Sequence, residues 1–306
     1  MWVRKRTVAS LVAAAVIILV ASGQTSQSIS SRLIEHRLCL ADLGNYWYTV
    51  VFPKAAERTR YSGESEYLFS IVSPDGRSLF ASRRELNARG IVRDTLVRRE
   101  LTPSGAGAEQ VIPVPFTVLF QFAVSRNERF MVIAGRLQDQ KVDKDKRDGI
   151  FVLDRNTDTI HQIVPYASRS QDVRSLNVGD RGDLVIYEDK GFVLTYTGAN
   201  GELAPIGRQP GNFPVLMPDG QGFVYADRTE LILNTGESRR ELLSAPNVVG
   251  SIRVSPDSAF VAFGIDLFGD LSSTQLRICD LKTLACVDGP KYSDWIAARE
   301  TFWVRQ

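Results

Sequence analysis

The sequence predicts an all-β fold, a six-bladed β-propeller, with five or seven blades as alternatives. A Pro-Asp turn lies between two short apolar runs at Ser73-Pro74-Asp75-Gly76, and it returns at Met217-Pro218-Asp219-Gly220 and Ser255-Pro256-Asp257-Ser258. Recurrence of one hairpin at intervals of tens of residues is typical of repeat architectures. A length of 306 residues suits a single propeller. Beyond the leader, the sequence shows no sustained apolar period of 3.6 residues, so strands rather than helices are expected.

The first 23 residues are predicted to be an export signal. Arg4, Lys5 and Arg6 precede an uncharged apolar run over residues 8–21, and small polar residues follow. A positive start, a short apolar run and a small-residue exit are typical of a signal peptide. The run is short for a membrane-spanning helix, although an uncleaved N-terminal anchor is the alternative. We expect a polar leader over 24–44, with a short helical turn near 33–40, and the propeller over 45–306.

Five consecutive units of four strands are predicted along the chain. Pro at the second turn position fixes φ, and Asp and Gly suit the positions after it. The turns between first and second strands centre on Asp75, Asn127, Arg181, Asp219 and Asp257, at spacings of 52, 54, 38 and 38 residues. Units of this size are typical of propeller blades. The strands are expected at 67–72, 79–82, 90–97 and 98–101; 118–124, 130–134, 149–154 and 159–164; 173–178, 184–188, 191–196 and 203–206; 212–216, 223–226, 230–233 and 240–243; and 248–254, 260–264, 275–280 and 285–287.

The two ends of the chain are predicted to build the sixth blade together. Apolar runs at 295–298 and 301–304 resemble a first and a second strand, and runs at 46–52 and 59–61 resemble a third and a fourth. Such closure removes the exposed edges that an open sheet must otherwise protect. The aromatic residues gathered here are interpreted as packing of the closure rather than as a binding patch.

These motifs resemble the WD40-like repeats of the TolB propeller family. The resemblance rests on Ser-Pro-Asp-Gly before an apolar strand and on strands such as Gly149–Asp154 and Leu276–Leu281, each before a polar turn. Ser125-Arg126-Asn127-Glu128 departs from the motif at three of its four positions. The resemblance covers about residues 45–306 and implies a periplasmic or secreted propeller that binds other proteins. It does not identify the partner, because one fold supports many functions.

Two of the three cysteines are predicted to form a disulfide. A hairpin that turns at Lys282-Thr283 places Cys279 opposite Cys286, and opposed residues in an antiparallel pair lie within bridging distance. A disulfide would suit an exported protein, and two buried free thiols are the alternative. Cys39 is left in the leader, either free or paired with another chain.

Three connections between second and third strands are predicted to form a partner-binding face. They are 83–89, 136–148 and 265–274, and they should emerge on the same side of the propeller, where loops on a rigid scaffold often carry function. Ordinary variable loops are the alternative. The candidate partner-binding residues in these loops are Arg83, Arg84, Arg89, Asp143, Asp145, Asp148, Leu267 and Phe268.

The sequence shows no catalytic constellation or cofactor motif. Asp143-Lys144-Asp145 has the wrong spacing for a calcium loop, and its lysines oppose cation binding. The two histidines, His36 and His161, stand apart, and no Gly-x-Ser-x-Gly elbow accompanies them. A channel site of the metal-dependent lactonase or sialidase type stays open as an alternative, because its residues would come from separate blades.

The charge balance gives no support for a nucleic-acid partner. The formal net charge is +2, and without Arg4, Lys5 and Arg6 the chain has 34 basic against 35 acidic residues. A nucleic-acid interface would need a basic stripe. The sequence therefore predicts an exported, non-enzymatic scaffold in the cell envelope, with no metal or cofactor. A protein partner is expected, membrane contact only through an uncleaved N-terminus, and the oligomeric state stays open.

Overall fold

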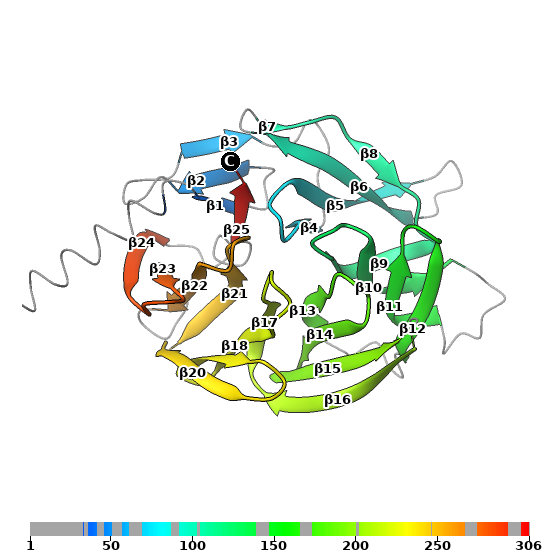
Figure 1. The fold of residues 1–306 in the computed structure, drawn as a ribbon. Helices are drawn as coiled ribbons and strands as arrows, with labels where there is room; N and C mark the ends of the chain where they lie inside the picture. The colour runs from blue at the N-terminus through cyan, green and yellow to red at the C-terminus, as the bar shows by residue number, and fades with distance from the viewer. Residues whose placement is uncertain are drawn as a thin grey trace, which may run out of the picture.

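The computed structural model shows an all-β propeller, with sheets arranged around a central axis (Figure 1). It describes residues 33, 36–41, 46–50, 57–60, 69–86, 92–102, 105–138, 147–165, 173–199, 202–245, 247–266, 274–292 and 301–305. The predicted all-β propeller is confirmed. None of the described residues forms a helix long and apolar enough to cross a membrane.

Five blades are built from consecutive strands, in the order that the repeats predict. Every pairing within them is antiparallel, and the innermost strand comes first in each blade. The strands are β4 (Phe69–Val72), β5 (Ser78–Leu86), β6 (Val92–Thr102), β7 (Gly105–Ala106) and β8 (Gln110–Ile112); β9 (Phe116–Val124), β10 (Phe130–Leu137), β11 (Asp148–Asp154) and β12 (Thr159–Pro165); β13 (Val173–Val178), β14 (Leu184–Asp189), β15 (Phe192–Ala199) and β16 (Glu202–Pro210); β17 (Asn212–Leu216), β18 (Phe223–Asp227), β19 (Glu230–Asn234) and β20 (Arg239–Ser244); and β21 (Val248–Val254), β22 (Phe260–Asp266), β23 (Thr274–Asp280) and β24 (Cys286–Tyr292).

A buried serine closes the turn between the first two strands in three of these blades. The Ser73 hydroxyl donates to Asp75 Oδ1 at 2.6 Å and accepts from the backbone N–H of Ser78 at 3.0 Å. Ser125 and Ser255 bond in the same way to the third turn residue and to the residue five positions on. The side chains thus satisfy backbone groups that the tight turn would leave unpaired.

The first blade differs from the prediction in its outer half. We expected separate strands at 90–97 and 98–101, but β6 runs unbroken through both and pairs along β5 from Leu86↔Val92 to Ser78↔Glu100. Neither Val97 nor Arg98 is a typical turn-forming residue, so the strand continues through both. The outer position is filled instead by β7 and β8, which pair with different parts of β6.

The two ends of the chain do build one further sheet, but not in the predicted proportions. Its order is β25 (Thr301–Arg305), β1 (His36–Ala41), β2 (Tyr46–Val50) and β3 (Glu57–Arg60). Among the described residues, the C-terminal part of the chain supplies β25 to this sheet, and the predicted strand at 295–298 lies outside the described residues. The expected helical turn and polar leader are wrong for 36–41, because these residues pair with both β25 and β2.

The core lies between neighbouring blades. Phe80 and Leu96 of the first blade pack with Phe116, Phe122 and Met131 of the second in one buried cluster. Similar clusters join the other neighbours. Strands such as β22, buried at every residue, therefore read as continuous apolar runs.

Trp303 of β25 joins the terminal sheet to the fifth blade. Its side chain is 4% exposed, packs in a cluster with Phe260 and Leu276, and stacks on Phe260 at 6.3 Å between ring centroids. Its indole N–H donates to the carbonyl of Arg253 at 3.3 Å. One side chain thus combines apolar burial with a hydrogen bond across the seam.

We expect Trp303→Ala to lower the free energy of unfolding by about 3–5 kcal/mol, because it removes a large buried side chain. Urea titration followed by circular dichroism measures this loss. Ile206→Ala is the matched control: Ile206 is 63% exposed, and its truncation should change stability by no more than about 0.5 kcal/mol. Equal losses of stability in the two variants would show that Trp303 does not hold the terminal sheet against the fifth blade.

Candidate functional site

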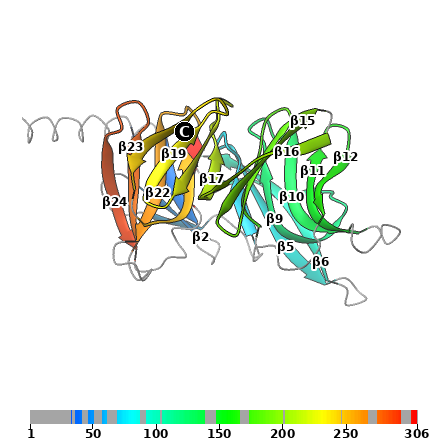
Figure 2. The same ribbon diagram turned by 90° about the horizontal axis from the view of Figure 1, so that it is seen from below.

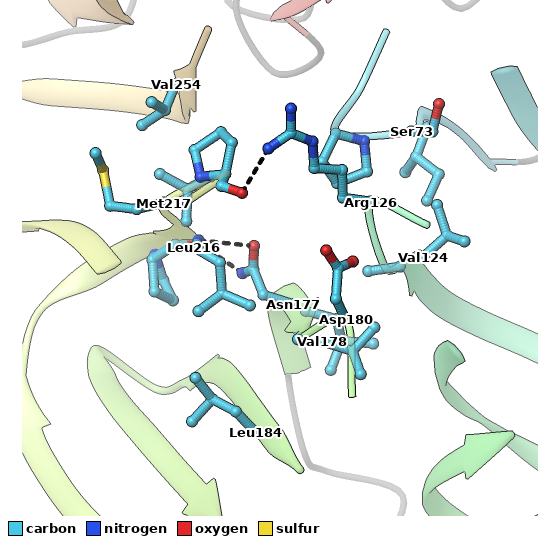
Figure 3. A pocket seen from close by; sticks show the side chains of 18 of the residues that line it. Ser73, Val124, Arg126, Asn177, Val178, Asp180, Leu184, Leu216, Met217 and Val254 are labelled. Atoms are coloured by element: carbon cyan, nitrogen blue, oxygen red, sulfur yellow. Dashed lines mark hydrogen bonds between the residues drawn. The ribbon is translucent and has the colours of Figure 1, made fainter. Parts of the chain in front are cut away.

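A cavity of about 610 Å³ lies on the axis of the ring (Figure 3). The innermost strands β4, β9, β13 and β17 line it, together with residues of β21 and β25. Its mouth is formed by the turns that join first and second strands, among them Arg126, Asp180 and Asp219. A volume of this size falls in the range of small-molecule sites.

Apolar side chains form much of the wall below the mouth, with polar ones such as Gln121 and Asn177 between them. Six aliphatic or thioether side chains from four blades contribute to it (Figure 3), namely Val124, Val178, Leu184, Leu216, Met217 and Val254. Consecutive residues of each innermost strand line the cavity, because the free edge of that strand faces the axis while its side chains point alternately to the two faces of the blade. The wall therefore offers a ligand mainly apolar contact.

Two side-chain amides tie the innermost strands to one another. Asn177 of β13 donates to the carbonyls of Ser175 at 2.7 Å and Pro214 at 2.8 Å, and its oxygen accepts from the N–H of Leu216 at 3.2 Å. Oriented to suit its neighbours, the Gln121 amide of β9 donates to the carbonyl of Val173 and accepts from the N–H of Ser175. Both amides thus bond with the backbone of the next blade.

The amides act where the innermost strands are irregular. The register of β13 shifts between Arg174 and Asn177, and that of β17 shifts between Asn212 and Val215. Ser175 and Phe213 lie inside these bulges with φ of 51° and 54°. A bulge leaves backbone groups outside the ladder, and the amides bond with those groups.

Two buried carboxylates serve the same purpose farther from the axis. Asp94 Oδ2 accepts from the N–H of Leu119 at 2.8 Å, and Glu188 Oε2 accepts from the N–H of Phe213 at 2.8 Å. Each bond joins one blade to the innermost strand of the next. Sequence reasoning missed Asp94, Gln121, Asn177 and Glu188. Their only signal was a polar residue inside a strand.

Glu128 forms an ionic tie between the first two blades. It accepts from Arg98 Nε at 2.7 Å and from the Ser78 hydroxyl, and Arg155 donates to its backbone carbonyl at 2.7 Å. Burial lowers the pKa of the Arg155 guanidinium; the nearby Glu128 carboxylate opposes this and Arg98 adds to it. Glu128 takes the position that Gly76 has in the first blade, with φ of 57°.

Charged side chains on the rim of the cavity are mostly engaged with the protein itself. Asp180 Oδ1 accepts from the N–H of Asn127 at 3.0 Å, and Asp219 Oδ1 accepts from the N–H of Gln221 at 2.9 Å. Arg181 pairs with Asp183 at 2.7 Å. Arg126 instead reaches over the mouth and donates to the carbonyl of Pro218 at 2.9 Å (Figure 3).

Three of the predicted partner-binding residues lie at the far ends of the strands from this mouth. Arg84 pairs with Asp94 at 3.0 Å, Arg83 pairs with Glu85 at 2.7 Å, and Asp148 pairs with Arg136 at 2.6 Å. The hydrogen bond to Asp94 is the main cause that raises the pKa of Arg84, and the hydrogen bond from Arg83 is the main cause that lowers the pKa of Glu85. The structure does not bring these three residues together into one cluster by any described contact. The others, Arg89, Asp143, Asp145, Leu267 and Phe268, lie outside the described residues.

The predicted disulfide is confirmed. Cys279 and Cys286 are directly opposed in the β23–β24 pair, with 4.0 Å between Cα atoms and an S–S distance of 2.06 Å. Cys39 lies in β1, opposite Thr49 of β2 and Phe302 of β25, rather than in a leader.

The two histidines lie in different sheets. His161 lies in β12, as predicted, and His36 begins β1. Within the part of the chain that the structure describes, no three His, Cys, Asp or Glu residues are grouped so that they could hold a metal ion. The arrangement around the cavity offers a ligand apolar contact along the wall and a hydrogen-bond donor, Arg126, at the mouth.

Comparisons with known proteins show the fold. No protein-family model and no curated protein sequence matches the chain. Among solved structures, TolB from Acinetobacter baumannii superposes with a TM-score of 0.57 and 13% identity over 89% of this chain and 66% of that one. A putative TolB from Agrobacterium tumefaciens gives 0.52 and 11% over 88% and 97%. A putative 6-phosphogluconolactonase from Bacteroides uniformis gives 0.52 and 13% over 88% and 100%. The resemblance to TolB-type propellers is thus confirmed as a likeness of fold.

We expect Asn177→Ala to lower the free energy of unfolding by about 1–3 kcal/mol, because it leaves backbone groups of two blades without their partners. Thermal and urea unfolding measure the loss. Asn156→Ala is the control, since Asn156 is exposed in the β11–β12 turn, and its truncation should matter by less than about 0.5 kcal/mol. A stability unchanged in Asn177→Ala would show that the amide does not hold the ring.

Proposed function

We propose that this TolB-like propeller is an exported, non-enzymatic binding protein that holds a protein partner in the cell envelope. The observation that carries the proposal is the use of polar side chains around the cavity. Gln121, Asn177 and Asp180 all bond with backbone groups of other blades. Side chains committed in this way support a rigid scaffold better than a catalytic centre, which needs groups aimed at a substrate.

The partner-binding face is proposed to be the one that carries the connections between second and third strands. On this side β5 and β6 form a long hairpin that reaches below the neighbouring strands in Figure 2. Arg83, Arg84 and Glu85 lie near its end, where Arg84 and Glu85 are exposed. Arginine is one of the residues that most often carry the binding energy of protein interfaces.

Export is supported by the N-terminal pattern and by the disulfide together. Disulfides persist in oxidising compartments and are rare in reducing ones. The bridge between Cys279 and Cys286 fits such a compartment. Attachment to a membrane would come only through residues 1–23 if they stay uncleaved.

The sheet made from both ends of the chain is proposed to act as the sixth blade and to close the ring. Its innermost strand, β25, contacts β21 on one side and β4 on the other. Trp303 packs on Phe260 of the fifth blade. Closure of this kind leaves no blade with an uncovered face.

A propeller hydrolase of the lactonase or sialidase type is the second candidate. The cavity has the size of a substrate site. One solved propeller with a similar fold is titled a putative 6-phosphogluconolactonase. Hydrolysis of a panel of aryl esters and lactones, reduced by Leu184→Trp inside the cavity, would favour this candidate over the scaffold.

We expect the chain made with its own first 23 residues to leave the cytoplasm, lose that segment and carry one disulfide. Intact mass and maleimide labelling before and after reduction measure this, because Cys279 and Cys286 should react only after reduction. Reduction should cost roughly 2 kcal/mol of stability, since the closed loop is short. A version that starts at residue 24 is the control and should keep its thiols free. Reaction of Cys279 and Cys286 before reduction in both versions would contradict export.

We expect a photo-crosslinking amino acid at Arg89, Asp145 or Leu267 to give one adduct of the same added mass in cells. The physical reason is that each position falls in a connection between a second and a third strand, and these connections are proposed to carry the partner-binding face. Ile206, 63% exposed on the outer strand β16, and Arg181, with 85% of its side chain exposed at the cavity mouth, are the control positions. Adducts at the controls alone would move the partner to another face, and adducts at none would favour the hydrolase.

A further inference from the structure

At the cavity mouth, the second turn residue departs from the repeat in two of the five blades, and in both it is charged. The second residue of the five turns is Pro74, Arg126, Asp180, Pro218 and Pro256 in chain order. Proline at this position presets φ for the turn. Arg126 lacks this preset φ, and it places an exposed guanidinium on the rim of the cavity.

Arg126 differs from the other charged groups on this rim. Arg181 pairs with Asp183, while Asp180 and Asp219 each accept a backbone N–H. No carboxylate among the described residues lies within ion-pair distance of Arg126, which donates through one nitrogen to the carbonyl of Pro218. A guanidinium has five N–H donors, so most of its hydrogen-bonding capacity faces the mouth.

The hydrogen bond to Pro218 holds this cation in place. Arg126 follows β9 and Pro218 follows β17, so the side chain crosses from the second continuous blade to the fourth (Figure 3). A group fixed before binding loses less conformational entropy when a ligand arrives. The guanidinium is thus preorganised above the apolar wall.

Several polar side chains below Arg126 are engaged with the protein itself. Ser73 bonds with Asp75, Asn177 bonds with the backbone on both sides, and Thr197 donates to the carbonyl of Asp183 at 3.0 Å. What the wall presents is aliphatic and thioether surface, including Val124, Val178, Leu184, Leu216, Met217 and Val254. Burial of apolar ligand surface would supply the affinity.

We propose that this cavity binds a small monocarboxylate with an apolar body. The carboxylate accepts two parallel N–H bonds from Arg126, the geometry that a guanidinium favours. The apolar body lies against the wall, in a cavity of about 610 Å³. A single negative charge fits better than a phosphate dianion, because Asp180, Asp183 and Asp219 already place negative charge on the rim.

This site is independent of the proposed protein partner. Connections between first and second strands leave the propeller at the end opposite to those between second and third strands, because the strands are antiparallel. Adducts from the loop face test the partner, and ligand titration tests the cavity. A negative result in one of these tests does not contradict the other proposal.

The test compares sodium decanoate with decanol, each titrated below its aggregation limit against the purified protein 24–306. Binding is followed by calorimetry and by tryptophan fluorescence, since Trp303 lines the cavity. We expect decanoate to bind more tightly than decanol, and affinity in the series hexanoate, octanoate and decanoate to rise about fourfold per methylene. Equal affinity of decanoate and decanol would overturn the proposal.

Arg126→Gln is expected to weaken decanoate about 10-fold to 100-fold, the usual effect of losing hydrogen bonds to a charged group, and to leave decanol unchanged. Arg181→Gln is the matched control on the same rim and should bind decanoate like the natural protein, because Arg181 already pairs with Asp183. Unchanged decanoate binding in Arg126→Gln, or an equal loss in Arg181→Gln, would overturn the assignment.

Two further variants guard against an effect of misfolding. Arg126→Lys keeps the charge but not the planar fork, so the preference for decanoate over decanol should shrink without disappearing. Leu184→Trp fills part of the cavity and should weaken the binding of all ligands in the series, while the circular dichroism spectrum stays unchanged. Chain-length dependence that persists in a folded Leu184→Trp protein would place the ligand elsewhere and overturn the proposal.

Discussion

The innermost strand of each blade has one edge without a neighbouring strand, and this constraint shapes the centre of the molecule. Backbone N–H and C=O groups on that edge face the axis, where a sheet partner is impossible. Buried backbone groups need partners. The protein supplies them with side chains from the preceding blade: the Gln121 and Asn177 amides near the axis, and the Asp94 and Glu188 carboxylates farther out.

The bulges in the innermost strands follow from the same constraint. An extra residue in β13 and in β17 turns part of the backbone away from the ladder and towards the adjacent blade. Ser175 and Phe213 accept positive φ there, and the amide bonds offset the strain. Much of the cavity wall is apolar because these amides and carboxylates bond with the backbone of the next blade. A rigid ring and an apolar cavity are thus two consequences of one arrangement.

Much of the fold could be predicted from the turns, and the rest depends on contacts that a sequence does not display. Ser-Pro-Asp-Gly fixes local geometry, so the strands around Ser73 and Ser255 and the Cys279–Cys286 pair fall where expected. The strand β1 was missed because one of its two partners, β25, lies some 260 residues away and its own residues carry no turn signal. Asn177 and Glu188 look like ordinary polar residues in strands. Their role appears only when the next blade is in place.

The most informative positions are those where a repeat breaks its own rule. In the second turn, Arg126 and Glu128 replace a proline and a glycine that would have shaped the turn locally. Glu128 instead binds Arg98 of the first blade, and Arg126 donates to the carbonyl of Pro218 of the fourth. In the third turn, Asp180 accepts the N–H of Asn127 from the second. Local preference is given up where a side chain can join blades or face a ligand, and natural sequences tend to break local rules at such sites. Because Arg126 bonds to a neutral carbonyl rather than to one of the rim carboxylates, its charge stays available at the cavity mouth.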